Sequence, residues 1–233
     1  MSNTYFQFKE FRIDQDKCAM KVCTDSCLFG AWIPVSGKEE NILDIGTGTG
    51  LLALMMAQRT RAKVDAVEIE REALEQAGEN IKNSKWAENI SIFHSDIIGF
   101  PTDKKYDLIL ANPPFYEKDL ESEKQEEKLA KHAQGLTLNK LLASIPPFLH
   151  PGTSLALLLP YFRKAEASLL LETSGWHIGH ELSVSNHPGS RYFRYLVFCS
   201  RNPVLKVTQT MSIYKNGKEY GPDFTELLSN FYL

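Results

Sequence analysis

The sequence has few cysteines and no long apolar run, and both absences exclude whole classes of protein. Its four cysteines are Cys18, Cys23, Cys27 and Cys199. Their spacing fits neither the disulfide framework of a small secreted domain nor the Cys-x2-Cys pairs of a zinc site, so we expect reduced, structural thiols and no metal. No apolar run approaches membrane-spanning length, and the first residues lack the order of a signal peptide. We therefore expect a cytoplasmic protein with no membrane contact and no obligatory protein partner.

A strong charge of either sign is also missing, since the net charge is −3. A mildly acidic total argues against a protein that coats nucleic acid, but it leaves room for a local basic surface. Residues 182 to 218 contain no Asp or Glu, and cations alternate there with aromatic residues. This segregation of charge predicts an RNA-binding surface that includes Arg191, Arg194 and Lys206.

Short apolar runs alternate with amphipathic segments along most of the chain. The runs that read as strands are residues 41–45, 63–68, 90–94, 107–111 and 154–159, and the helical segments between them are 51–60, 72–86, 136–149 and 164–174. This order predicts an α/β fold with a doubly wound, seven-stranded, mostly parallel sheet. Alternation in residues 195–200 and 204–213 predicts an antiparallel C-terminal hairpin. We expect one domain over 1–233, with a covering segment at 1–33 and the core at 40–233.

A glycine-rich turn follows the first core strand. Gly46, Gly48 and Gly50 would let the backbone approach a ligand closely, with the next helix N-terminus aimed at it. A dinucleotide site needs Gly or Ala where this chain has Leu51, so the spacing favours a nucleoside linked to methionine instead. Glu68 ends the second strand, where a carboxylate meets the ribose hydroxyls of such a ligand.

The tetrapeptide Asn112-Pro113-Pro114-Phe115 closes the fourth strand and indicates the chemistry. Two prolines fix the turn, so that the Asn112 side-chain oxygen and the Pro113 carbonyl can accept two hydrogen bonds from one planar amino group. Phe115 would stack on the attached ring. Two acceptors would localise the nitrogen lone pair toward an electrophile without a strongly basic side chain. The alternative explanation is a tight turn at a strand end.

The motifs, taken as a set, resemble the Rossmann-like S-adenosylmethionine-dependent methyltransferases that modify amino nitrogens. A narrower resemblance, to the bacterial tRNA1(Val) adenine-N6-methyltransferases, runs from near residue 5 to the C-terminus. It is carried by Phe8-Lys9-Glu10-Phe11, Cys18-Ala19-Met20-Lys21-Val22, Thr24-Asp25, Gly30-Ala31-Trp32 and Asn230-Phe231-Tyr232-Leu233. Enzymes of that family methylate the adenine just 3′ of the anticodon, so the resemblance implies tRNA as the substrate.

The resemblance also implies roles for single residues. S-adenosylmethionine would lie over the glycine turn, with its ribose at Glu68, its adenine at Asp96 and Ile97, and the target base at Asn112, Pro113 and Phe115. The implied cofactor-binding residues are Lys21, Thr24, Asp25, Asp44, Gly46, Gly48, Gly50, Glu68, Asp96, Ile97 and Asn112. The chain departs from the family pattern at Phe115, where Tyr is frequent, and at Cys23 and Ser26, where glycine is frequent.

Other functions share parts of this pattern. A protein glutamine N5-methyltransferase uses the same tetrapeptide, but usually carries a helical domain ahead of the glycine turn. An rRNA amino-methyltransferase stays open as a second reading. A non-catalytic S-adenosylmethionine-binding module would not need the tetrapeptide, and an NAD-dependent oxidoreductase is disfavoured by Leu51. Residues 117–131 are rich in charge and are interpreted as a solvated helix or flap.

Overall fold

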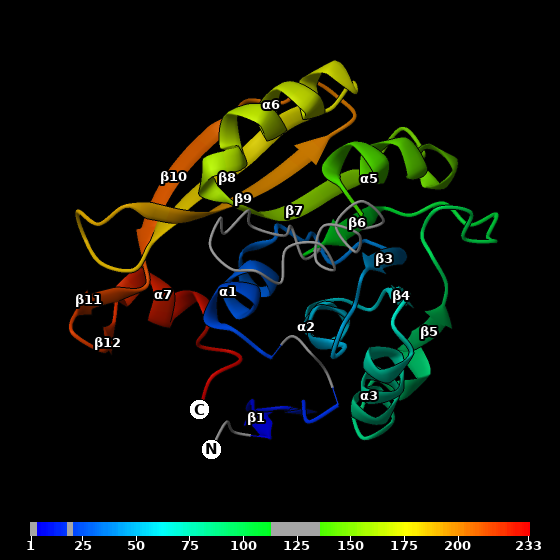
Figure 1. Cartoon of the computed structure of the whole chain (residues 1–233), viewed down its shortest axis with the longest axis horizontal. Coiled ribbons are helices and arrows are strands. Elements are labelled where there is room, and N and C mark those ends of the chain that lie inside the picture. The colour runs from blue at the N-terminus through cyan, green and yellow to red at the C-terminus, as the bar shows by residue number, and fades with distance from the viewer. Residues whose placement is uncertain (1–3, 18–20, 113–135) are drawn as a thin grey trace, which may run out of the picture.

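The computed structural model describes residues 4–17, 21–112 and 136–233 (Figure 1). Within them, an eight-stranded sheet has the order β10-β8-β9-β7-β6-β3-β4-β5. Its strands are β3 (Asn41–Ile45), β4 (Lys63–Glu68), β5 (Ile90–His94), β6 (Leu108–Ala111), β7 (Ser154–Pro160), β8 (His177–Ser185), β9 (Tyr192–Ser200) and β10 (Val207–Ser212). Two small antiparallel sheets pair β1 (Tyr5–Gln7) with β2 (Arg12–Asp14) and β11 (Tyr214–Asn216) with β12 (Glu219–Tyr220).

The helices follow the strands in the alternating order that the sequence predicts. They are α1 (Thr24–Trp32), α2 (Leu51–Arg59), α3 (Arg71–Lys82), α5 (Leu138–Ser144), α6 (Lys164–Thr173) and α7 (Pro222–Leu227), with short 3-10 turns η1 (Ala87–Asn89), η2 (Pro146–Phe148) and η3 (Tyr161–Arg163). Gly175 has φ +76° immediately beyond α6, in the left-handed conformation that ends helices. The predicted helix 136–149 is shorter, because the two prolines at 146 and 147 turn its end into η2.

The C-terminal part of the sheet differs from the prediction. The antiparallel hairpin joins β8 to β9, whereas residues 207–212 add to β8 as a parallel strand and do not pair with β9. The sheet therefore has eight strands and not seven. Alternation marks a residue range as a strand, but it does not say which neighbour that strand will pair with. The doubly wound, mostly parallel architecture is confirmed.

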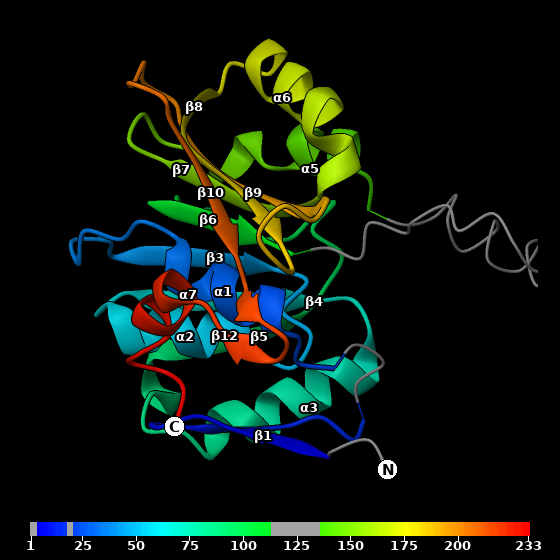
Figure 2. The same cartoon turned by 90° about the vertical axis from the view of Figure 1, so that its left-hand side faces the viewer.

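Two hydrophobic clusters lie on the two faces of the sheet. Ile42 belongs to one and its neighbour Leu43 to the other, because successive side chains on a strand point to opposite faces. The first cluster packs against α1, α2 and α7, and the second against α5 and α6. Figures 1 and 2 show these two groups of helices on opposite sides of the sheet. Burial on both faces explains why the central strands are almost continuously apolar.

The part of the predicted covering segment 1–33 that precedes α1 contains the β1–β2 hairpin. This hairpin lies beside α3 and the C-terminus, as Figure 2 shows. The backbone N–H of Lys9 donates to the carbonyl of Phe231 at 2.8 Å, and the Phe8 and Tyr232 rings are 6.1 Å apart. Asn80 on α3 bonds both backbone groups of Asp14. The two ends of the chain are thus held together on one side of the molecule.

Two expected absences can be examined in the part of the chain that the structure describes. None of its helices has both the length and the apolar character needed to cross a membrane. Cys23, Cys27 and Cys199 are free thiols, and Cys27 and Cys199 are buried, while Cys18 lies outside the described residues. Burial raises the pKa of the Cys27 thiol to about 12, which keeps it protonated.

Candidate functional site

The carboxyl ends of three neighbouring strands bring the predicted site residues together. In the sheet register, Ile45 on β3 pairs with Val67 on β4 and with Ala111 on β6. The next residue along each strand is therefore Gly46, Glu68 or Asn112. Ligands of open α/β sheets bind at this edge. Residues up to 66 positions apart in the sequence, Gly46 and Asn112, thus meet in one row.

The glycine turn between β3 and α2 has the backbone conformation that only glycine adopts easily. Gly46, Gly48 and Gly50 have φ of 70°, 57° and 81°. A Cβ atom added to Gly46 or Gly48 would meet no atom within 4 Å, so open space lies over both residues. At Gly50 it would meet Ala77 of α3 at 3.5 Å. Two glycines therefore face open space, and the third faces a packed helix.

Two acidic side chains lie beside this turn. Glu68 is buried, and its oxygens accept hydrogen bonds from the backbone N–H groups of Gly48 at 2.8 Å and Ile69 at 2.9 Å. Asp44 is fully buried, and its Oδ2 accepts from the Thr47 hydroxyl at 2.6 Å. The Oδ1 atom of Asp44 has no hydrogen-bond partner. Burial raises the pKa of Asp44 to about 7, so this carboxyl titrates near neutrality.

Asp96 and Ile97 lie in the turn after β5, next to the carboxyl end of β4. The Asp96 side chain is exposed, and its Oδ1 accepts from the backbone N–H of Ile98 at 2.9 Å. Ile97 is buried in the second hydrophobic cluster. Glu68 pairs with His94 in the sheet register, which puts this turn directly beside Glu68.

Helix α1 brings the N-terminal motif to the same edge. Asp25 is buried, and its Oδ2 accepts from Arg194 Nε on β9 at 2.5 Å. From their side chains, Thr24 or Asp25 would be expected to cap this helix, but that expectation is wrong. Thr24 begins the helix, and the N-cap is Cys23, without a side-chain hydrogen bond. The Lys21 ammonium donates to the backbone carbonyl of Gln15 at 2.6 Å.

Asn112 contacts α1 through a residue to which the sequence assigned no role. The Asn112 Nδ2 donates to the Ser26 hydroxyl at 2.9 Å, and Ser26 is buried. The Ser26 Oγ also lies 3.0 Å from Cys23 Sγ. The one feature of the sequence that pointed to Ser26 was its departure from the family pattern, in which glycine is frequent at this position. Pro113 and Phe115, predicted to act with Asn112, lie outside the described residues, as does the segment 117–131.

The three predicted RNA-binding cations differ in their surroundings. Arg191 lies in the exposed loop between β8 and β9. Arg194 forms the ion pair with Asp25 described above. Lys206 pairs with the buried Glu181 at 3.1 Å. In both ion pairs the partner is a buried carboxylate, Asp25 or Glu181, that lies outside the acid-free segment 182–218. The sequence of that segment therefore gives no sign of either partner. The RNA-binding role of these residues stays a prediction.

The comparisons with known proteins agree with this arrangement. A family model described as the methyltransferase small domain matches residues 18–140. A protein of Dyadobacter fermentans named tRNA1(Val) (adenine(37)-N6)-methyltransferase is 41% identical, over 99% of this chain and 98% of its own length. A protein of the same name from Tolumonas auensis is 40% identical over the whole chain and 98% of its own length. The chain belongs to this tRNA1(Val) adenine-N6-methyltransferase family.

Solved structures agree with the family assignment at the level of the fold. A predicted O-methyltransferase of Agrobacterium tumefaciens superposes with a TM-score of 0.67 at 16% identity, covering 88% of this chain and 95% of that one. A SAM-dependent methyltransferase of Aquifex aeolicus gives 0.51 at 19% identity, covering 69% and 81%. At such identities the likeness concerns the Rossmann-like fold alone. Among the described residues, no group of three or more His, Cys, Asp or Glu is arranged to hold a metal ion.

Proposed function

We propose that this chain transfers a methyl group from S-adenosylmethionine to N6 of an adenine in tRNA, namely the adenine 3′ of the anticodon in tRNA1(Val). The observation that carries the proposal is the row formed by Gly46, Glu68 and Asn112 at one sheet edge, in a chain of this family. In this row, Gly46 and Glu68 offer a place for a nucleoside, and Asn112 offers a hydrogen-bond acceptor for an amino group. The substrate implies the cytoplasm as the compartment.

The residues around the glycine turn fit S-adenosylmethionine. The open space over Gly46 and Gly48 gives room for the ligand against the backbone. The unpartnered Oδ1 of buried Asp44 supplies an acceptor that a cationic group would satisfy. Glu68 keeps acceptor capacity for a ribose hydroxyl, because Oε1 accepts from two backbone N–H groups but Oε2 accepts only from that of Gly48. When bound, the cofactor supplies a methyl group on a positively charged sulfur.

The family motif assigns Asn112 to the target base. Its amide nitrogen is bonded to Ser26, so its oxygen is the atom left to accept from the amino group of the base. The target must leave its stack to reach this edge, which costs least in a loop. Holding the amine in line with the methyl group then supplies most of the catalysis. Pro113 and Phe115 are proposed to complete the binding of the base.

The test is methyl transfer from labelled S-adenosylmethionine to bulk tRNA, bulk rRNA and protein extract, each from cells that lack this chain. Label in tRNA as N6-methyladenosine would support the proposal, and mapping would then give the position. Label in rRNA or on a protein glutamine would retain the chemistry at Asn112 and overturn the substrate. Absence of label from all three fractions would leave only a cofactor-binding role.

Replacing Asn112 by alanine tests its assigned role. The Asn112→Ala variant should lose at least about a hundredfold in kcat, because an oriented acceptor contributes roughly that much to such a step. Binding of the cofactor, followed by calorimetry, should stay within about twofold of the original protein. A parallel fall in cofactor affinity and turnover would show that Asn112 serves the cofactor and not the amine.

A further inference from the structure

A cavity lies at the same sheet edge, three strands away from Asn112. Strand β8 ends at Ser185, which pairs with Tyr192 at the start of β9 and with Ser212 at the end of β10. Since β8 runs parallel to β6, these ends share the edge that carries Asn112. Three strand spacings amount to about 14 Å. An RNA strand bound at Asn112 can therefore reach this place with a nucleotide near the target.

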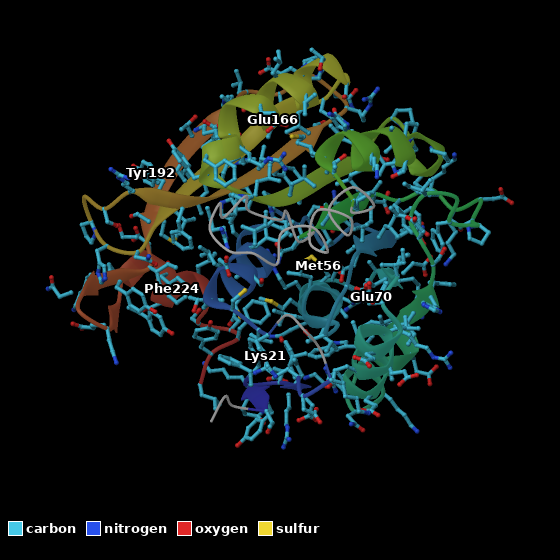
Figure 3. The ribbon with its side chains drawn as sticks, viewed as in Figure 1. Lys21, Met56, Glu70, Glu166, Tyr192 and Phe224 are labelled. Carbon is cyan, nitrogen blue, oxygen red and sulfur yellow. The ribbon has the colours of Figure 1, made fainter. Side chains whose placement is uncertain are left out.

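The cavity has the size of a small-molecule site. Its volume is about 600 Å³, within the range of pockets that enclose ligands. It is bounded by the ends of β8, β9 and β10, by the β8–β9 loop and by the residues that lead into α7. The lining includes Ser185, Tyr192, Thr210, Ser212, Tyr214 and Lys215. Figure 3 shows Tyr192 on the same side of the molecule as Phe224 of α7.

The lining suits a nucleobase better than a phosphate. The hydroxyl groups of Thr210 and Ser212 can exchange hydrogen bonds with the edges of a base. The hydroxyl of the buried Ser185 is already bonded to the His187 carbonyl. Tyr192 is partly exposed, so its ring can present a stacking face, whereas the Tyr214 ring already stacks on Tyr220. The lone cation of the lining, Lys215, forms an ion pair with Glu219, and Asp223 also lines the space. Protein sites for unstacked RNA bases combine aromatic faces with such polar groups.

We infer that this cavity holds one unstacked nucleobase of the RNA substrate, separate from the target adenine. The inference rests on the proposed function, since it names a second contact with the same RNA. It also gives the acid-free segment 182–218 a role beyond charge, because β9, β10 and the loop between β8 and β9 all belong to it.

The experiment pairs a protein change with an RNA change. Methyl transfer is measured with a stem-loop RNA that contains the target adenine, and with versions in which each other loop nucleotide in turn lacks its base. Tyr192→Ala should raise KM for the intact RNA about tenfold, the usual loss for one stacked base, and leave kcat unchanged. At the one loop position whose base occupies the cavity, removing the base should raise KM in the original protein. The same removal should leave the KM of Tyr192→Ala unchanged.

Tyr5→Ala is the matched control, because Tyr5 and Tyr192 are each 38% exposed and Tyr5 lies on the N-terminal hairpin. Its effect should be additive with every abasic change. Additive effects of Tyr192→Ala at every position, or an unchanged KM, would overturn the inference. Thr210→Val, which removes one hydroxyl from the cavity, replaces Tyr192→Ala if the latter no longer binds cofactor. Failure of the original protein to methylate the intact RNA would instead count against the proposed function.

Discussion

At the scale of single residues, the site depends on a contact between two segments that lie far apart in the sequence, the first turn of α1 and the end of β6. The hydrogen bond from Asn112 to Ser26 joins the end of β6 to the first turn of α1. Asp25, the neighbour of Ser26, is tied to Arg194 on β9. Helix α1 is therefore fixed to the sheet at two adjacent residues, Asp25 and Ser26, and the second of them orients the Asn112 amide.

This contact predicts a catalytic effect for Ser26. In Ser26→Ala the Asn112 amide loses its partner and rotates more freely, so kcat should fall by roughly two- to tenfold, the equivalent of one hydrogen bond. Cofactor affinity should be unchanged, because none of the observed hydrogen bonds of Ser26 joins it to the glycine turn. Steady-state kinetics at saturating cofactor and calorimetric binding would separate the two quantities.

Cys23→Ala provides the control for Ser26. It removes the other neighbour of the Ser26 hydroxyl, at 3.0 Å, and leaves the bond to Asn112 in place. Its kcat should match that of the original protein. Equal losses in Ser26→Ala and Cys23→Ala would mean that the first turn of α1 acts as a whole, and that the hydroxyl has no particular role.

The positions of the site residues were predictable, but their partners were not. Gly46, Glu68 and Asn112 each end a recognisable apolar run, and the edge rule for parallel sheets brings such ends together. The contact between Asn112 and Ser26 depends on how α1 packs, which periodicity does not encode. Similarly, Arg194 and Lys206 look free in the sequence, whereas the fold gives each a buried carboxylate.

At the scale of elements, the packing of α1 on α2 depends on one glycine. A Cβ atom at Gly30 would lie 2.5 Å from Met55 Sδ and 3.1 Å from Leu52 Cδ2. The first distance is too short for a real contact and the second is tight, and Met55 is fully buried. Because α1 also carries Asp25 and Ser26, any shift of this helix would be felt at Asn112.

Gly30→Ala should therefore destabilise the protein, although alanine is the better helix former by about 1 kcal/mol. Overpacking a core typically costs about 1–3 kcal/mol, which outweighs that gain. Chemical unfolding would measure the difference, and kcat should fall with it. Gly78→Ala on α3 is the matched control, because its Cβ would meet only the end of the Ile92 side chain, at 3.0 Å. A Gly30→Ala variant as stable as Gly78→Ala would contradict this account of the interface.

At the scale of the whole molecule, the sequence predicts the architecture, but it does not predict how the strands β8, β9 and β10 pair at one edge of the sheet. The strands from β3 to β7 can be recognised in the sequence as apolar runs followed by turns or helices. Right-handed crossovers then allow few orders of these strands in the sheet. Beyond α6 the sequence marks residues 195–200 and 204–213 as strands only by alternation, which does not identify the neighbour of a strand. Strand β10 (Val207–Ser212) is mostly exposed and rich in polar residues, and it pairs in parallel with β8.

That edge is held by a buried carboxylate, and this gives the molecule a specific sensitivity to acid. Glu181 on β8 accepts hydrogen bonds from Tyr195 at 2.8 Å and Thr208 at 3.0 Å, and pairs with Lys164 and Lys206 at 3.1 Å each. Burial alone opposes ionisation, but the hydrogen bonds from Tyr195, Lys206 and Lys164 outweigh it and lower the pKa of Glu181 to about 2. The ionised form thus links α6, β8, β9 and β10.

The sign of the pH effect follows from this lowered pKa. Because the folded state releases the Glu181 proton more readily than the unfolded chain, whose ordinary pKa is 4.5, the stabilisation is complete above about pH 4.5 and is lost as pH falls toward 2. In Glu181→Gln the charge is absent at every pH. The stability advantage of the original protein over this variant, measured by urea unfolding, should therefore shrink between pH 4.5 and 2. Other carboxylates titrate in both proteins and cancel in the difference, so a constant advantage across that range would show that Glu181 stabilises the sheet edge by packing and not by charge.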